Sequence, residues 1–277
     1  MDKKRISLAD LDLLKQTFNK YGLHTVCQSA KCPNIGECFK NKTATFMILG
    51  NICTRNCDFC ATQHGIPLQQ DMKEPIKLAN IIKILKLKYV VITSVTRDDL
   101  PDGGAMHFKN VVDIINREIP DIKMELLVPD FKGIKKNIDI VLSSKFNIFG
   151  HNIETVPNLY KFRKGADYKR SLNVLAYAKE KGFIIKTGIM LGLGETEKEL
   201  LEVFKDLKNI NCDILTIGQY LKPLKNNAEM LKEYSDEEFE YLKQKALEAG
   251  IKICVSGKYV RSSYFADNTF KKITSVG

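Results

Sequence analysis

Clustered cysteines constrain the fold and chemistry of this 277-residue chain more than any other feature of its sequence. Six of the eight cysteines form two groups of three, Cys27-x4-Cys32-x5-Cys38 and Cys53-x3-Cys57-x2-Cys60. Clusters of this kind form disulfides in secreted proteins, whereas inside cells they bind metals or carry out redox chemistry. The compartment therefore decides which of these two interpretations applies.

The sequence favours a cytoplasmic protein. Its N-terminus, MDKKRISLADLDLLKQ, is basic but lacks the apolar core and the small-residue cleavage site of a signal peptide. The most apolar stretch, residues 81–95, is interrupted by Lys83, Lys86 and Lys88 and falls short of a membrane span. We therefore expect cysteines that bind a metal centre rather than each other.

Short apolar runs alternate with helical patterns from residue 44 onward. Strands are expected at residues 44–49, 89–94, 122–128, 147–150, 183–191 and 213–218. Helices are expected between them at residues 77–87, 105–118, 132–143, 168–181 and 196–208. This alternation is typical of right-handed βα crossovers in a parallel sheet, and the pattern alone fits a doubly wound sheet or a barrel.

Both ends of the chain add elements to this core. Residues 7–21 are expected to form an amphipathic helix that ends at Gly22. A second helix at 235–249 begins with a capping-box sequence, and a strand at 251–255 and a polar tail follow it. We expect one core at 44–220, an N-terminal extension at 1–43 and a C-terminal segment at 221–277.

Each cysteine group offers three thiolates rather than the four that a structural zinc site requires. Three thiolates suit a four-iron cubane cluster in which one iron stays open for another ligand. The second group follows an expected strand, at the end where parallel α/β folds place their active sites. A structural zinc site and inert buried cysteines are the alternatives for these six residues, whereas Cys212 and Cys254 stand alone in apolar strands and are expected to be structural.

The motif Cys53-Thr-Arg-Asn-Cys57-Asp-Phe-Cys60 resembles the signature of the radical S-adenosylmethionine (SAM) superfamily, including the aromatic Phe59. Further segments resemble the lipoyl synthase family over nearly the whole chain: Cys32-Pro-Asn-Ile-Gly-Glu-Cys38 and residues 44–50, 97–104, 218–221 and 261–264. The resemblance implies an α/β fold, a partial (β/α)6 TIM-like barrel with an N-terminal cysteine-rich extension and a C-terminal tail.

The resemblance also implies two 4Fe–4S clusters and SAM as cofactors. Cys53, Cys57 and Cys60 would hold the cluster whose open iron binds SAM. The other trio would hold an auxiliary cluster that is consumed as the sulfur donor, with a serine as its fourth ligand. These auxiliary ligands would be Cys27, Cys32, Cys38 and Ser263.

Polar and glycine residues at expected strand ends are candidates for SAM binding. Some follow the second and fourth strands of the expected barrel, where ligands bind in such folds, and residues 188–195 resemble the adenine-side motif of the superfamily. With Phe59, the candidates are Arg97, Asp98, Asp99, Asn152, Glu154, Gly188, Gly192 and Glu195. His151 fits either a hydrogen-bonded core residue or a ligand.

The implied reaction inserts sulfur at C6 and C8 of an octanoyl group on a lysine of a carrier protein. That carrier would be a lipoyl domain or a glycine cleavage H-type protein, and a flavodoxin or ferredoxin would supply electrons. The net charge is +10, and a basic cluster gathers in residues 161–170. This cluster fits a solvated helix face or a docking surface for an acidic carrier, which an acidic electron donor could share.

Three other functions compete with this interpretation. A methylthiotransferase acting on tRNA suits the positive charge, but no RNA-binding motif is visible after residue 220. A noncatalytic iron–sulfur protein would need fully ligated clusters. A zinc-dependent nucleic-acid module would need an aromatic stacking platform, and the sequence shows none. We expect neither a nucleic-acid partner nor a membrane partner.

Overall fold

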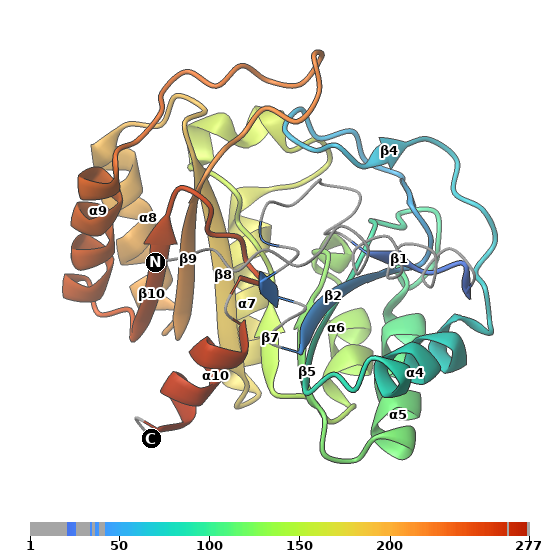
Figure 1. Ribbon diagram of the computed structural model, residues 1–277. Helices are drawn as coiled ribbons and strands as arrows, with labels where there is room; N and C mark the ends of the chain where they lie inside the picture. Colours follow the sequence, from blue (N-terminus) through green and yellow to red (C-terminus); the bar gives the residue numbers. More distant parts are fainter. Residues whose placement is uncertain (1–20, 26–33, 35–36, 39–41, 265, 276–277) are drawn as a thin grey trace.

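The computed structural model describes residues 21–25, 34, 37–38, 42–264 and 266–275. Its main sheet has the strand order β1-β2-β5-β6-β7-β8-β9-β10, and Figure 1 shows it curving with helices along its outer side. The antiparallel edge strand is β1 (His24–Thr25). The parallel strands are β2 (Thr43–Ile48), β5 (Tyr89–Ser94), β6 (Lys123–Leu127), β7 (Ile148–Gly150), β8 (Ile184–Leu191), β9 (Ile214–Gln219) and β10 (Ile253–Gly257).

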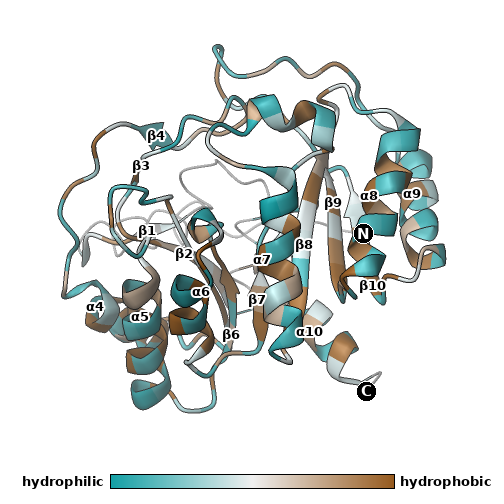
Figure 2. Cartoon of the chain, turned by 180° about the vertical axis from the view of Figure 1, so that it is seen from behind, coloured by the Kyte–Doolittle hydropathy of each residue, from teal (hydrophilic) through white to brown (hydrophobic). Residues whose placement is uncertain are grey.

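In the described part of the chain, six helices cover the outer face of this sheet. They are α4 (Glu74–Ile84), α5 (Ala105–Glu118), α6 (Lys135–Leu142), α7 (Tyr168–Glu180), α8 (Glu197–Asn209) and α9 (Asp236–Glu248). Alternate strand residues such as Ile92 and Leu126 pack against helix residues such as Phe108 and Phe204 in one large apolar core. Figure 2 shows the consequence, helices that are brown toward the sheet and teal toward solvent. Burial of these apolar faces is the main force that holds the helices on the sheet.

A last helix, α10 (Ala266–Ser275), packs on the opposite face of the sheet. Tyr89 and Val91, which alternate with the outward Val90 and Ile92, form a buried cluster with Ala266. Ile148 and Ile214 form another with Ile273. The segment expected as a polar tail therefore includes a helix, whose few apolar side chains recur at helical spacing and pack inside the partial barrel.

The remaining elements are short. Strands β3 (Ile52–Cys53) and β4 (Gln63–His64) pair in a separate two-stranded sheet. The 3-10 helices are η1 (Phe131–Gly133) and η2 (Pro157–Phe162). No helix among residues 21–25, 42–264 and 266–275 is long and apolar enough to cross a membrane.

The expected α/β fold, a partial barrel, is confirmed, and so are its six strands and five intervening helices. The expected strand at 251–255 is β10 at 253–257, because it pairs in parallel with β9 from Ile253 opposite Ile214 to Gly257 opposite Gly218. The expected helix at 77–87 begins earlier, at Glu74, whose buried carboxylate accepts a hydrogen bond from the backbone N–H of Leu49. The expected helix at 7–21 lies outside the described residues except for its last residue, Tyr21.

A buried ion pair lies within the barrel. Lys186 Nζ on β8 donates to Glu125 Oε2 on β6 at 2.9 Å, and both side chains are at most 2% exposed. The Tyr89 hydroxyl donates to the same oxygen at 3.2 Å. Three strands of the sheet are therefore linked by one charged group that water does not reach.

Lys186→Met is expected to lower the free energy of unfolding by about 3–5 kcal/mol, because it leaves Glu125 charged and buried without a cation. Chemical denaturation measures the change. The double variant Lys186→Met/Glu125→Leu, which removes both charges, should recover much of the loss. Equal destabilisation in the single and double variants would contradict this view of the pair.

Candidate active site

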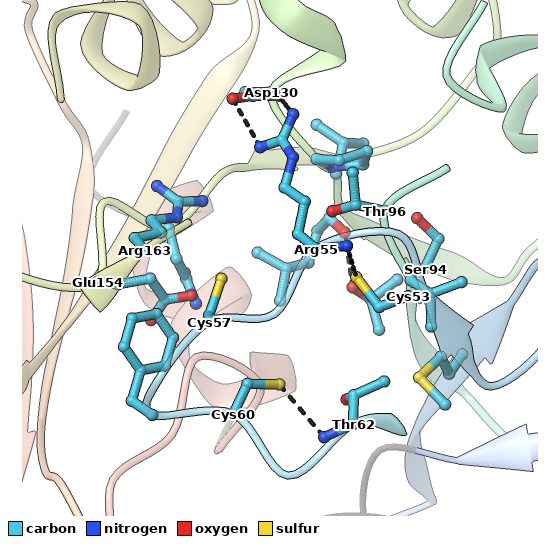
Figure 3. A pocket seen from close by; sticks show the side chains of 18 residues that line it. Cys53, Arg55, Cys57, Cys60, Thr62, Ser94, Thr96, Asp130, Glu154 and Arg163 are labelled. Atoms are coloured by element: carbon cyan, nitrogen blue, oxygen red, sulfur yellow. Dashed lines mark hydrogen bonds and ion pairs between the residues drawn. The ribbon is translucent and has the colours of Figure 1, made fainter. Parts of the chain in front are cut away.

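A cavity lies where the carboxyl ends of the strands meet the loop that carries Cys53, Cys57 and Cys60. Figure 3 shows the three thiols with side chains from the ends of β5, β6 and β7 around them. Besides the cysteines, its polar lining is Arg55, Thr62, Thr93, Ser94, Thr96, Asp130, Asn152, Glu154 and Arg163. Its apolar lining is Met47, Phe59, Val95, Leu127, Val128 and Pro129.

The surroundings of the three thiols suit metal-bound thiolates. The backbone N–H of Arg55 donates to Cys53 Sγ at 3.4 Å, and that of Thr62 donates to Cys60 Sγ at the same distance. Burial raises the pKa of Cys57 to about 12, and the nearby Arg163 opposes that shift. Metal binding would hold these thiols as thiolates, with the N–H donors and the cation of Arg163 already nearby.

The three thiols lie around one cavity. Within residues 21–25, 34, 37–38, 42–264 and 266–275, no three His, Cys, Asp or Glu side chains come close enough to hold one metal ion. A structural zinc site needs its ligands converged on one point. A cubane instead binds each thiolate at a different iron, so the three cysteines around one cavity fit a 4Fe–4S cluster.

Arg55, between the first two cysteines, anchors this loop to two strand ends. Its guanidinium donates to both oxygens of Asp98, which follows β5, at 2.7 and 3.0 Å. It also donates to both oxygens of Asp130, which follows β6, at 2.8 and 3.0 Å. Burial alone would raise the pKa of Asp130, but these bonds and the charge of Arg55 lower it to about 2. Asp130 is therefore ionised, and the bidentate pairs fix the loop.

A second attachment comes from the loop between β9 and α9. Asn227 Nδ2 donates to the backbone oxygens of Asp58 and Cys60, at 3.0 Å each. The N–H of Ala228 donates to the oxygen of Asp58 at 2.7 Å. Figure 1 shows this loop crossing above the sheet toward the β3–β4 region. Its sequence carries no recognisable signal for this role, because Asn side chains in loops usually satisfy local turns.

Two residues predicted from the sequence, Asn152 and Glu154, line the cavity. Burial raises the pKa of Glu154, while the charge of Arg163 and a hydrogen bond with Asn152 oppose that shift. Figure 3 shows Glu154 between Arg163 and the ring below it, close to Cys57. The pair offers a carboxylate and an amide to a cationic or hydroxyl-bearing ligand.

Several cavity residues are not among those predicted from the sequence. Ser94, at the end of β5, has a buried hydroxyl with no hydrogen-bond partner among the described residues. Thr96 and Arg163 also line the cavity. The position of Ser94 at a strand end could have indicated it, but the prediction named the charged residues that follow it.

Those charged residues, Arg97, Asp98 and Asp99, are absent from the cavity lining. Arg97 is buried and donates to Asp99 at 2.8 and 2.9 Å and to the backbone oxygen of Leu49. Asp98 is occupied by Arg55. The structure thus gives this triplet a role in tying strand ends together.

Gly188, Gly192 and Glu195 are also absent from the lining. A Cβ on Gly188 would collide with the Ser262 hydroxyl, so this glycine makes room for the C-terminal segment. Glu195 accepts hydrogen bonds from the N–H groups of Gly192 and Leu193 and from the Tyr234 hydroxyl. Gly192 and Glu195 therefore shape the turn after β8.

His151 is a buried residue whose Nδ1 lies 2.8 Å from the Val128 carbonyl oxygen, and burial lowers its pKa to about 3. It is a neutral core residue in the described structure. Cys212 and Cys254 are buried in the apolar core, as expected from the sequence.

The auxiliary residues fall partly outside the described chain. Cys27 and Cys32 lie outside it, whereas Cys38 and Ser263 lie within it. Neighbours of these two meet, because the Tyr264 hydroxyl donates to Glu37 Oε2 at 2.9 Å. Asn34 Nδ2 also donates to the backbone oxygen of Tyr259 at 2.7 Å. The N-terminal cysteine-rich segment and the Arg261–Tyr264 segment are therefore in contact.

Comparison with known proteins identifies the family. The family model of the radical SAM superfamily matches residues 47–207. The chain is 48% identical to lipoyl synthase of Aquifex aeolicus over 269 residues, which cover 96% of this chain and 98% of that protein. It is 51% identical to lipoyl synthase of Caldicellulosiruptor saccharolyticus, covering 91% and 89%. The chain belongs to the lipoyl synthase family.

Solved structures agree on the fold. Methylornithine synthase (PylB) is 14% identical with a TM-score of 0.56, covering 99% of this chain and 94% of that one. The hydrogenase maturase HydG of Carboxydothermus hydrogenoformans is 15% identical with a TM-score of 0.55, covering 96% and 78%. The expected family and enzyme class are confirmed, and a 4Fe–4S cluster and SAM follow from membership of the superfamily.

Asn227→Ala is expected to loosen the cluster loop, because it removes two hydrogen bonds worth about 1 kcal/mol each. A chelator should then strip iron from the reconstituted protein roughly ten-fold faster. Absorbance of the cluster measures that rate. The exposed neighbour Asn226→Ala is the control and should match the parent. Equal iron loss from both variants would show that Asn227 does not hold the loop.

Proposed function

We propose that this chain inserts two sulfur atoms at C6 and C8 of an octanoyl group carried on a lysine of a small carrier protein. The observation that carries the proposal is the cavity in which three cysteines, a buried carboxylate and an orphaned hydroxyl meet at the strand ends. Sequence identity near 50% to lipoyl synthases supports it over nearly the full length of the chain.

Cys53, Cys57 and Cys60 would hold a 4Fe–4S cluster, with Phe59 packed beside it. When bound, this cluster supplies one electron to SAM, which breaks the C5′–S bond and gives methionine and a 5′-deoxyadenosyl radical. The remaining work of the chain is to bind SAM, aim its reactive carbon and keep other hydrogen donors away.

Residues at the strand ends would bind SAM. Ser94 and Asn152 offer hydrogen-bonding groups on two sides of the cavity, and Ser94 has no other partner in the described structure. Glu154 offers a carboxylate for the amino group or the ribose hydroxyls, and Arg163 offers a cation for a carboxylate. Arg97, Asp98, Asp99, Gly188, Gly192 and Glu195 would act indirectly, by holding the strand ends and the C-terminal segment in place.

A second 4Fe–4S cluster would be held by Cys27, Cys32, Cys38 and Ser263 and would supply the sulfur atoms. The contacts of Tyr264 with Glu37 and of Tyr259 with Asn34 support this assignment, because they hold the two ligand-bearing segments together. An oxygen donor is a hard and unusual ligand for iron, so that corner would open most easily when sulfide leaves.

The proposed partners follow from this chemistry. The substrate would be an octanoylated lipoyl domain or an H-type protein of glycine cleavage, and the electron would come from a flavodoxin or ferredoxin. The reaction would take place in the cytoplasm, without nucleic acid or membrane. Residues 1–43, 44–220 and 221–277 would serve as auxiliary extension, radical SAM core and C-terminal segment.

Mass spectrometry of the carrier tests the proposal. Reconstituted protein is incubated without oxygen with octanoylated carrier, SAM and reductant, and deoxyadenosine is quantified in the same tube. A dithiolane on the carrier with about two deoxyadenosines per lipoyl group is expected. Deoxyadenosine without sulfur on the carrier would overturn the proposed substrate.

The two cysteine trios are expected to give different phenotypes. Cys57→Ala should abolish deoxyadenosine formation, because SAM receives no electron. Cys32→Ala should still form deoxyadenosine but transfer no sulfur. The same phenotype from both variants would contradict the proposed division of labour.

Ser263→Ala is expected to form deoxyadenosine but little lipoyl product, because the auxiliary cluster would lose its fourth ligand. Ser262→Ala is the control at the adjacent serine, whose hydroxyl contacts Asn152 at 2.9 Å. It should affect SAM binding instead of the second cluster. A normal lipoyl yield from Ser263→Ala would refute the ligand assignment.

A further inference from the structure

A basic groove borders the cluster cavity. It is lined by the segment from η2 to the start of α7: Pro157, Tyr160, Lys161, Arg163, Lys164, Gly165, Ala166, Asp167, Tyr168 and Lys169. Lys161, Lys164 and Lys169 are exposed, and Asp167 is the one acidic residue in this lining. The groove therefore presents a positive surface to solvent.

Arg163 is the wall between this groove and the cavity, because it lines both. Figure 3 shows its side chain next to Cys57. Its guanidinium donates to the Tyr160 hydroxyl and to Ser171 Oγ, at 3.0 Å each. One ordered side chain thus separates the groove from a thiol of the cluster site.

The groove is also attached to the cluster loop. Asp58, between Cys57 and Cys60, donates its N–H to the backbone oxygen of Phe162 at 2.8 Å. Its carboxylate lies 3.3 Å from Lys164 Nζ. A protein seated in the groove would therefore rest against the loop that carries the cluster.

The side chains of this wall pack against one another. The Tyr160 ring stands edge-on to Tyr168 at a centroid distance of 5.4 Å, and the Tyr168 hydroxyl donates to Asp206 at 2.9 Å. An octanoyl chain would have to pass through this wall to bring its carbons into the cavity. An electron needs only a short path through packed atoms, so the groove suits electron delivery better than substrate entry.

We propose that the basic groove is the docking surface of an acidic one-electron donor protein of the flavodoxin type. This inference rests on the proposed function, which requires one electron for each SAM cleaved. The reduced flavin of the donor loses one electron and the 4Fe–4S cluster gains it, and no atom crosses the interface. The positive groove would steer the acidic donor into place and raise the rate of encounter.

The double variant Lys161→Glu/Lys169→Glu tests the assignment and leaves the contact between Lys164 and Asp58 intact. Its binding to flavodoxin is measured by titration, and its deoxyadenosine formation is measured with reduced flavodoxin and, separately, with dithionite. We expect about ten-fold weaker binding and a similar loss of flavodoxin-driven rate. The dithionite-driven rate should stay unchanged, because a small inorganic reductant needs no docking surface.

Lys88→Glu/Lys123→Glu is the matched control. It makes the same change in net charge with exposed lysines at the opposite end of the strands, where Lys88 precedes β5 and Lys123 is the first residue of β6. It should bind flavodoxin as the parent does. The milder Lys161→Gln/Lys169→Gln should give an intermediate loss and shows that the Glu variant is not merely misfolded.

Two results would overturn the inference. Unchanged flavodoxin binding in the Glu variant would show that the groove is not the donor surface. Weaker binding of the octanoylated carrier with unchanged flavodoxin binding would assign the groove to the carrier. If the parent forms no deoxyadenosine with dithionite, the proposed function fails, while flavodoxin binding still decides the groove.

Discussion

Two bidentate ion pairs of Arg55, with Asp98 and Asp130, hold the site together. One guanidinium joins the cysteine loop to Asp98 after β5 and to Asp130 after β6. Arg170 at the start of α7 adds a second cation to Asp130 at 3.0 Å. Two cations thus balance two carboxylates in a largely buried network, so the network carries little unpaired charge. Because regular strands hold side chains more precisely than loops do, these contacts fix the position of the loop.

The C-terminal segment links the site to the inside of the barrel. It passes the inner face of the sheet at Gly188 and Gly218, where a Cβ would collide with Ser262 or with the backbone of Val260. Ser262 then meets Asn152 of the cavity lining. Helix α10, which follows, fills the space beside Tyr89 and Ile148. The C-terminal segment therefore contacts both the cavity lining, through Ser262, and the cysteine-rich segment, through Tyr264.

Much of this architecture is predictable from sequence. Alternating strands and helices are set by local hydrophobic periodicity, so α5 at Ala105–Glu118 was found to the residue. The cysteine spacing likewise identified the loop that lines the cavity. Helix α10 was not predicted, because its few apolar residues form no long periodic run and are buried only by contact with the inner face of the barrel.

The roles of charged residues were harder to predict. The sequence makes Arg97, Asp98 and Asp99 candidate ligands of SAM because they follow a strand, and the structure pairs Asp98 with Arg55 and Asp99 with Arg97. Ser94, three residues before Arg97 at the end of β5, lines the cavity. Which of several polar residues at a strand end faces a ligand depends on side-chain pairing across the fold. One sequence does not record that pairing.

The central claim is that SAM binds on a cluster held by Cys53, Cys57 and Cys60. Electron–nuclear double resonance on the reduced protein, with SAM isotope-labelled in its amino and carboxylate groups, tests it most directly. We expect both labelled groups to couple to the cluster spin in the parent and the coupling to disappear in Cys57→Ala. A reduced cluster with no coupling to either group would contradict it.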